Sequence, residues 1–431
     1  MLILYNVSYH TKTHRRYNMA QVNITLSQEE VLQVLAGNRD EAFKYLAERI
    51  LNQIMLVESA EQLGAERHER TSERHDYRNG SRERVLNTRI GTLELELPRH
   101  RNQPFHTMLF DNYQRSEASL IATMVQMVID GVSTRKVSNV VEKLCGTSFS
   151  KSGISELCKK LDAEIEAFKT RPLDMVDAPF LMVDATYFKA RENHKIVSKA
   201  FMVALVIKTD GTREIAGFDI FDKEDDVSWQ AFFKDLKSRG LTNVDMVISD
   251  AHKSILNAVV HTYSNAAWQR CQVHFVRNIL NYTPAKYQAG LKVELRNMFN
   301  ALTINEARSL RDEIINDYAP VAEKAMQTLD DGFEDAMTVM QLPPHMRIKL
   351  RSSNMIERLN REFKRRSQVV QIFPNPESIL RLMGAVAVEY NDSLSTKHRV
   401  FSDKTYETIR VEIIPKLKEI ASCQQSLLDA A

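Results

Sequence analysis

Three carboxylates in this chain occupy positions from which they could bind a divalent metal ion. Asp184 follows the apolar run 180–183 and Asp250 follows the apolar run 246–248, and both runs have the pattern of short buried strands. Glu357 lies in RSSNMIERLNREFKRR at 351–366, a helical pattern dense in arginine. Because Mg²⁺ prefers carboxylate, phosphate and water oxygens, the sequence predicts a site for Mg²⁺ at these three residues, with Mn²⁺ as an expected substitute.

Other acidic residues compete for the same roles. Glu362 lies five residues after Glu357 on the same expected helix, and at about 100° per residue it points about 140° away, so the two cannot serve one site. Asp245 lies too early in its strand to replace Asp250. A single aspartate after a strand is more often a turn or helix cap than a ligand, so the metal site depends on the full set of three.

The elements that must position these carboxylates have an α/β pattern. Strands are expected at 180–185, 200–208, 214–221, 244–249 and around 268–273, with helices at 229–236 and 252–263. From 276 to about 340 the period is helical throughout, so a helical block separates Glu357 from the two aspartates.

The N-terminal half has a different pattern. A helix is expected from Asp40 to Leu63, with an apolar stripe facing a core or a partner: Phe43, Leu46, Ile50, Ile54 and Val57. VLNTRIGTLELELP at 85–98 alternates around Gly91, which predicts a hairpin. Helical patterns follow at 118–130, 134–145 and 151–168, and prolines at 172 and 179 place a linker near 170–180.

The turn GTSFS at 146–150 joins the last two helical patterns into a candidate helix-turn-helix. An ordinary helical hairpin has the same signature, because this motif is weakly specified by sequence. The net charge of +2 and pI of about 8.2 are too mild to indicate nucleic-acid binding alone. Basic clusters at 67–101 and 347–366 favour it, although such runs can also be solvated faces.

Composition restricts the compartment. No apolar stretch approaches the ~20 residues of a membrane-spanning helix, so we expect no membrane partner and a soluble, intracellular protein. The four cysteines are scattered, which predicts free thiols in a reducing environment. The absence of a glycine-rich phosphate loop indicates no nucleotide cofactor.

Six segments, in one order, cover most of the chain. They are YRNGSRERVLNTRIGTLELELPRHRN at 77–102, GVSTRKVSNVVEKLCGTSFSKSGISELCKKLD at 131–162, VDATYFKAR at 183–191, SDAHKSILNAV at 249–259, WQRCQVHFVRNIL at 268–280 and NMIERLNREFKRRSQVVQIFPN at 354–375. Together they resemble the DDE transposases of the Mutator-like group of bacterial insertion sequences.

The resemblance implies an α/β RNase H-like catalytic domain at 180–275 and 345–395, interrupted by an all-helical insertion at 276–344. It is preceded by a mainly helical DNA-binding region with a helix-turn-helix. The remaining expected boundaries are a loose or mis-started tail at 1–18, a helical and hairpin region at 19–115, the helix-turn-helix region at 116–171 and a C-terminal helical tail at 396–431.

The implied activity is binding of an element's terminal inverted repeats, followed by metal-dependent cleavage and strand transfer. Asp184, Asp250 and Glu357 are the implied catalytic ligands. The expected partners are double-stranded DNA and further copies of the chain. Two sets of basic residues are expected to contact DNA: Lys151, Lys159 and Lys160 in the N-terminal half, and Arg361, Lys364, Arg365 and Arg366 beside Glu357.

Four residues have expected accessory roles. Cys271 and His274 form a C-x-x-H pair, but a structural zinc needs about four ligands and no second pair exists, so a subsidiary role beside the active site is favoured. Trp268 is expected to pack in the core, with stacking on a flipped base as the alternative. His252 could orient a phosphate or water, or could be a polar residue at a helix start.

Two other functions fit parts of the pattern. An RNase H-like nuclease would hydrolyse nucleic acid without strand transfer, and a domesticated DNA-binding regulator would use the helix-turn-helix alone. The complete carboxylate set disfavours the regulator, because a pure binding protein has no need of it.

Overall fold

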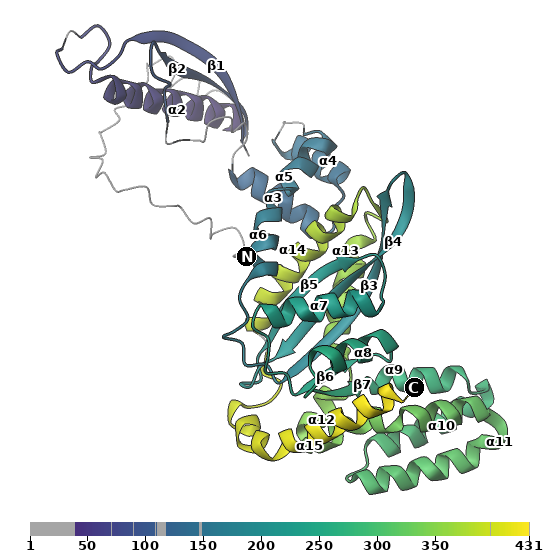
Figure 1. The fold of residues 1–431 in the computed structure, drawn as a ribbon. Coiled ribbons are helices and arrows are strands. Elements are labelled where there is room, and N and C mark those ends of the chain that lie inside the picture. Colours follow the sequence, from purple (N-terminus) through teal and green to yellow (C-terminus); the bar gives the residue numbers. More distant parts are fainter. Residues whose placement is uncertain are drawn as a thin grey trace. The chain divides into compact units, whose positions relative to one another are not determined.

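The computed structural model describes residues 39–430 apart from positions 70, 89, 108, 110–117, 146–148 and 397 (Figure 1). The expected tail at 1–18 lies outside the described residues. The chain divides into two compact units, the first ending at Lys159 and the second beginning at Lys160. Among the described residues no helix is long and apolar enough to cross a membrane.

A helix on a hairpin forms one core of the first unit. β1 (Arg78–Thr88) and β2 (Gly91–His100) pair antiparallel, with Gly91 at φ 113° where the chain turns. α2 (Arg39–Leu63) covers the apolar face of this hairpin. The packed side chains are Met55, Leu86, Leu93, Leu95, Leu97 and Phe105, with Ala47 and Leu51 against them.

The expected apolar stripe of α2 is therefore not the face that meets the hairpin. Phe43 is 63% exposed and Ile50 is 37% exposed, whereas Ala47, Leu51 and Met55 face the core. Apolar residues occupy two adjacent faces of α2. The periodicity of the sequence indicates the face that does not meet the hairpin.

Three short helices form the second core of this unit: α3 (Ala118–Ile129), α4 (Thr134–Cys145) and α5 (Lys151–Cys158). Leu120, Met124, Val137, Val141 and Ile154 are their buried contacts. Gly131, at φ 86°, ends α3 as its position predicts. Ser150 caps α5 by accepting a hydrogen bond from the Gly153 amide at 3.0 Å.

The expected helix at 151–168 is two helices that belong to different units. α6 (Leu161–Thr170) follows α5 after a break at Lys159 and Lys160. Asp162 of α6 accepts two 2.6 Å bonds from Arg381 of α14 (Pro376–Ser395). α6 is thereby fixed to the second unit, and the division falls earlier than the linker expected near 170–180.

A mixed sheet organises the second unit, with strand order β5-β4-β3-β6-β7. β3 (Phe180–Glu192), β4 (Lys195–Ile207) and β5 (Arg213–Phe221) are an antiparallel meander. β6 (Met246–Ser249) and β7 (Ala267–Arg270) run parallel to β3, and the short β8 (Ile372–Phe373) also pairs with β3. The expected α/β pattern is confirmed.

β3 is longer than the expected 180–185 because a tight turn leads directly into β4. Asn193 and His194 both have positive φ, 48° and 61°, as a two-residue hairpin turn with the twist of its strands requires. The sequence has no glycine there, so the usual signal of such a turn is missing.

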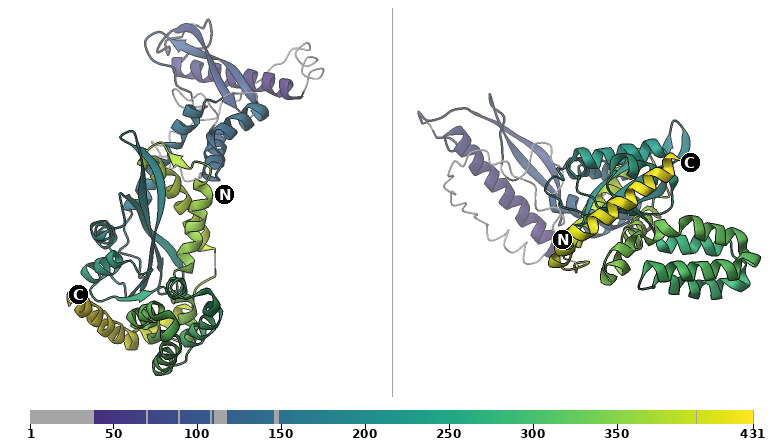
Figure 2. Two further views of the ribbon diagram at one scale, coloured as in Figure 1. Left: turned by 90° about the vertical axis from the view of Figure 1, so that its right-hand side faces the viewer. Right: turned by 60° about the horizontal axis from the view of Figure 1, so that its bottom comes forward.

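Helices cover both faces of the sheet. α7 (Asp226–Ser238) and α8 (Lys253–Thr262) pack Trp229, Phe233 and Ile255 on one face. α13 (Asn354–Ser367) and α14 lie on the other, where the ring of Phe363 meets that of Phe201 at 5.1 Å between centroids. Figure 2 shows the sheet edge-on between the teal and the yellow-green helices.

A helical block lies between β7 and α13. It consists of α9 (Gln272–Asn281), α10 (Ala285–Phe299), α11 (Ile304–Met337), the 3₁₀ helix η1 (Thr338–Gln341) and α12 (Pro344–Leu350). The first three have a core of their own around Phe275, Leu295 and Leu329. α11 is one element with non-helical geometry at Ala322, just after Pro320, where two helices were expected.

The C-terminal helix α15 (Asp403–Asp429) is an integral part of the second unit. Gln424 accepts from the Trp268 amide at 2.8 Å and donates to the Trp268 carbonyl at 2.9 Å. The side-chain amide of Gln424 therefore pairs with the Trp268 backbone groups at the outer edge of the sheet, where the Thr338 hydroxyl also donates to the carbonyl at 2.9 Å.

We expect Phe363→Ala to lower the free energy of unfolding of the second unit by about 3–5 kcal/mol, because the ring is fully buried between α13 and the sheet. Phe363→Leu should cost much less, since it leaves a smaller cavity. Denaturant unfolding followed by circular dichroism measures both. Equal small effects would mean that α13 is not fixed by this contact.

Candidate active site

The strand register brings Asp184 and Asp250 together. β3 and β6 pair at Phe180↔Met246, Leu181↔Val247 and Met182↔Ile248, and the same offset carries Asp184 onto Asp250. Neighbouring strands lie about 4.8 Å apart, so the two carboxylates flank the point where the parallel ladder ends. Asp184 was expected at the end of its strand; it lies instead where β3 loses β6 as a partner and continues beside β4.

α13 carries the third expected ligand, Glu357, and is attached to Asp184 through another of its residues. Its apolar residues Ile356, Leu359 and Phe363 are buried, which fixes the helix on the sheet. Asn360 donates from Nδ2 to Asp184 Oδ2 at 2.7 Å. Glu357 lies three residues before Asn360, about one helical turn away and on the same side of α13.

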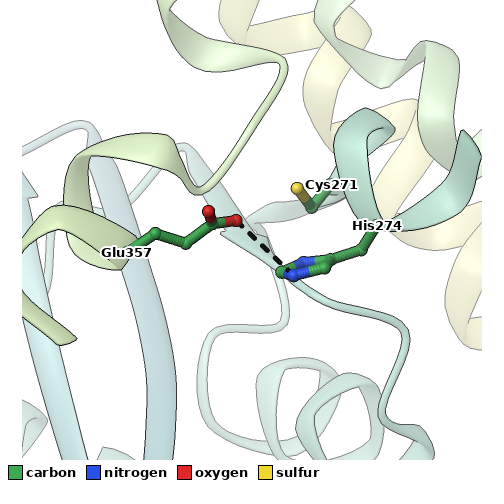
Figure 3. A group of neighbouring side chains, drawn as sticks. All are labelled: Cys271, His274 and Glu357. Carbon is green, nitrogen blue, oxygen red and sulfur yellow. Dashed lines mark ion pairs between the residues drawn. The ribbon is translucent and has the colours of Figure 1, made fainter. Parts of the chain in front are cut away.

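Cys271 and His274 meet Glu357, as Figure 3 shows. His274 Nε2 lies 3.5 Å from Glu357 Oε1, and one ligand atom from each of the three residues lies within 4.8 Å of the other two. The third member of the group is thus Glu357, from a helix distant in the chain. The spacing of Cys and His residues along the sequence does not indicate that a glutamate joins them. No other such group of three or more His, Cys, Asp or Glu occurs among the residues that the structure describes.

Backbone and side-chain bonds around Cys271 join the strands to α13. The Cys271 amide donates to the Ser249 carbonyl at 2.7 Å, directly before Asp250. Ser353, at the start of α13, donates to Cys271 Sγ from its amide at 3.3 Å and from its hydroxyl at 3.2 Å. The same hydroxyl lies 3.3 Å from Glu357 Oε1. The thiol is therefore a fixed point between two elements that carry carboxylates.

The surroundings of Asp184, His274 and Cys271 shift the pKa of each of these three groups. Burial raises the pKa of Asp184 to about 7, and the nearby carboxylate of Asp250 adds to the effect. The hydrogen bond with Cys271 raises the pKa of His274, to which the charges of Glu357 and Asp250 contribute. Burial opposes ionisation of Cys271, but bonds from His274 and Ser353 outweigh it and lower the pKa of the thiol.

Glu224 is a fourth carboxylate at this site, one that the sequence pattern does not predict. It is partly buried between β5 and α7, and its Oε1 accepts from Trp229 Nε1 at 3.3 Å. Burial raises its pKa, with His252 and Asp250 among the charges that act on it. Glu224 follows the polar residues 222–223 rather than an apolar run. The periodicity of the sequence therefore gives no reason to predict it as a site residue.

The three expected ligands supply the oxygen donors that a hard divalent cation prefers. Asp184, Asp250 and Glu357 are all partly exposed and lie on three elements. Among the described residues their oxygens do not all lie within 4.8 Å of one another, and Glu357 is grouped instead with Cys271 and His274. Two buried polar atoms, His252 Nδ1 and Asn360 Oδ1, have no hydrogen-bond partner, and a cation with its bound water would satisfy such atoms.

The structure separates the expected accessory residues. Cys271 and His274 belong to the site. Trp268 is 3% exposed and donates from Nε1 to Ser249 Oγ at 2.8 Å, which favours packing over stacking on a base. His252 precedes α8 without capping it, because its side chain makes no cap hydrogen bond. Cys158, Cys271 and Cys423 are free thiols, as expected, and the Cys145 side chain lies outside the described residues.

The basic residues expected to contact DNA differ in their exposure and in their ion pairs. Lys151 and Lys160 are exposed, and Lys159 pairs with Glu156 at 2.7 Å. On α13, Arg361 and Lys364 are exposed and lie four and seven residues after Glu357, so all three follow one side of the helix.

Two arginines of α13 depart from that expectation. Arg365 is bound to Glu362 through two hydrogen bonds at 2.8 and 3.1 Å. Arg366 is 7% exposed, with its guanidinium 3.7 Å from Glu389. Arg366 is thus a structural residue rather than a phosphate contact, because it lies on the opposite side of the helix from Glu357.

Without metal, ionisation of Asp184 should destabilise the fold. Its folded-state pKa lies near 7, above the ordinary 3.8, so this group's stabilising contribution is complete below about pH 4 and is lost as the pH rises through 7. We expect Asp184→Asn to raise the melting temperature of metal-free protein at pH 8 and to have little effect at pH 4. Thermal melts in chelator at both values measure this, and an equal shift at both would contradict it.

Comparison with known proteins identifies the family. The family model described as "Transposase, Mutator family" matches residues 19–396. The transposase for insertion sequence element IS256 in transposon Tn4001 of Staphylococcus aureus is 42% identical over 87% of this chain and 96% of its own length. The transposase for ISRM5 of Rhizobium meliloti is 39% identical over 86% and 92%, and that for IS1081 of Mycobacterium tuberculosis 34% over 83% and 86%.

A solved structure, the Drosophila P element transposase strand transfer complex, is similar at 10% identity and a TM-score of 0.28, over 73% of this chain and 92% of that one. This likeness is too weak to define a shared fold. The family match spans residues 19–396, and each of the three insertion-sequence relatives matches 83–87% of this chain. This chain belongs to the Mutator family of transposases.

Proposed function

We propose that this transposase is of the DDE type, with Asp184, Asp250 and Glu357 as ligands of Mg²⁺, and that it cleaves and joins the ends of an insertion sequence. The observation that carries the proposal is the Asn360–Asp184 hydrogen bond at 2.7 Å. It brings the glutamate-bearing helix onto the two strands whose aspartates are in register. Residues far apart in sequence would thus form one acidic site beside a basic helix.

The residues around the carboxylates hold them in position. Divalent cations bound there would activate the attacking oxygen and stabilise the leaving oxygen. Asn360 orients Asp184, and Ser353 and His274 orient Glu357 from either side of its carboxylate. Arg361 and Lys364, on the Glu357 side of α13, would hold the backbone phosphates of the DNA strand.

We also propose that the second unit is an RNase H-like domain. Its antiparallel meander β3-β4-β5, followed by β6 and β7 parallel to β3, is the pattern expected for that fold. The proposal includes a helical insertion between β7 and α13. The α4 and α5 helices would be the helix-turn-helix that reads terminal inverted repeats, with the exposed Lys151 at the start of α5. Since two element ends must be cut, at least two copies would act together on DNA.

We expect Asp184→Asn, Asp250→Asn and Glu357→Gln each to abolish Mg²⁺-dependent cleavage of a labelled terminal-repeat duplex while leaving DNA binding largely intact. Each change removes a ligand charge and little volume. Glu362→Gln is the matched control, because Glu362 only pairs with Arg365 and Arg366 on the same helix. Wild-type cleavage by any of the three variants would remove that residue from the site.

We expect a fragment ending at Lys159 to bind the terminal repeat specifically, with log affinity falling against log salt by about 0.9 for each phosphate contact. The fragment should end there because α6 belongs to the second unit. Fluorescence anisotropy at several salt concentrations measures this. Specific binding seen only in fragments that begin after residue 160 would place the reader elsewhere.

A further inference from the structure

A second, basic cavity lies on the face of the sheet that carries Asp184. It has a volume of about 70 Å³ and is lined by Leu205, Arg213, Met355, Arg358, Tyr390 and Leu394. A water molecule needs roughly 10–15 Å³, so the cavity has room for a tetrahedral phosphate group. Its lining comes from β4, β5, α13 and α14, all within the second unit.

The two arginines of this cavity are not neutralised by an acidic lining residue. Burial lowers the pKa of Arg213, and the nearby charge of Arg358 contributes. Arg213 donates one bond, at 3.0 Å, to the His398 carbonyl, which leaves most of the five donors of its guanidinium for other partners. Glu362 acts on Tyr390 at the rim, but its Oε2 is bonded to Arg365.

The sheet register places one wall of this cavity near Asp184. Asp184 is paired with Val203 across β3 and β4, and Leu205 lies two residues further along β4 on the same face. Such diagonal neighbours lie about 7–8 Å apart. Since each nucleotide advances about 3.4 Å along the DNA axis, a strand that passes Asp184 would reach this cavity within a few nucleotides.

We propose that Arg213 and Arg358 bind a single DNA backbone phosphate, within a few nucleotides of the one that is cleaved. Tyr390 lies beside both guanidinium groups and lines the same cavity. Arginine forms bidentate bonds with phosphate oxygens, and two arginines converging on one enclosed group would fix the strand's register rather than attract DNA in general. The proposal rests on the DNA-cleaving function proposed above and adds to it a position that defines where the strand is cut.

The first test is the salt dependence of DNA binding by the full chain in Ca²⁺ without cleavage. Arg358→Gln and Arg213→Gln should each make the slope of log affinity against log salt shallower by about 0.9, which is about 3.5-fold less loss between 50 and 200 mM salt. The double variant should lose about the same 0.9, because both serve one phosphate. A loss near 1.8 would indicate two separate contacts, and an unchanged slope would exclude DNA contact; either result overturns the proposal.

The second test locates the phosphate. A terminal-repeat duplex with one neutral methylphosphonate linkage, moved along the strand, should weaken wild-type binding most at one position within a few nucleotides of the cleavage site. At that position the Arg358→Gln variant should bind the modified and the unmodified duplex equally well, since its contact with this phosphate is already absent. Equal penalties in both proteins at every position would overturn the assignment. Arg308→Gln is the charge-matched control, because Arg308 is paired with Glu334 on α11 at 2.9 and 3.0 Å.

A free anion could use the same chemistry, and a third measurement distinguishes it. If inorganic phosphate stabilises the wild-type protein against heat but not the double variant, while the DNA slope is the same in both, the cavity binds a free phosphate and the DNA assignment is wrong. Failure of the proposed function has a different signature, because wild-type protein would then neither bind nor cleave the terminal repeat.

Discussion

The hydrogen bond from Asn360 to Asp184 is the contact on which the arrangement of this site depends. The two aspartates come from adjacent parallel strands and would lie together in any correctly paired sheet. Strand pairing does not position Glu357, because the helical block from α9 to α12 separates it from the two aspartates in the chain. A helix that carries a ligand must be attached to the sheet beside that ligand, and Asn360 makes this attachment at 2.7 Å.

Cys271 supports the same attachment from the other side. It ends the loop after β7, is bound to the Ser249 carbonyl beside Asp250, and accepts two bonds from Ser353 at the start of α13. With His274 it forms a polar pair in which each partner favours the charged form of the other. The His274 ring lies 3.5 Å from Glu357, so positive charge on this ring, which its raised pKa favours, would offset the repulsion among carboxylates. This explains a C-x-x-H pair without a second pair of zinc ligands.

Much of this could be predicted from sequence, and the exceptions have physical causes. Apolar runs identified all five long or central strands, since buried strands need continuous apolar residues. The β3–β4 turn was missed because Asn193 and His194 adopt positive φ without glycine. The α2 face was misjudged because that helix is apolar on two sides. Glu224 and Asn360 act through tertiary contacts with Asp250, His252 and Asp184, which no local pattern encodes.

Helix geometry separates the basic residues of α13 by their angle from Glu357. At about 100° per residue, Lys364 lies about 20° and Arg361 about 40° from Glu357, whereas Arg366 lies about 180° away. Their burial follows these angles: the first two are exposed, and Arg366 is buried against Glu389. One face of α13 is therefore committed to the sheet through Ile356, Leu359 and Phe363. The other face can place a metal ligand and phosphate-binding cations in one row, so any DNA strand that follows the cations passes over Glu357.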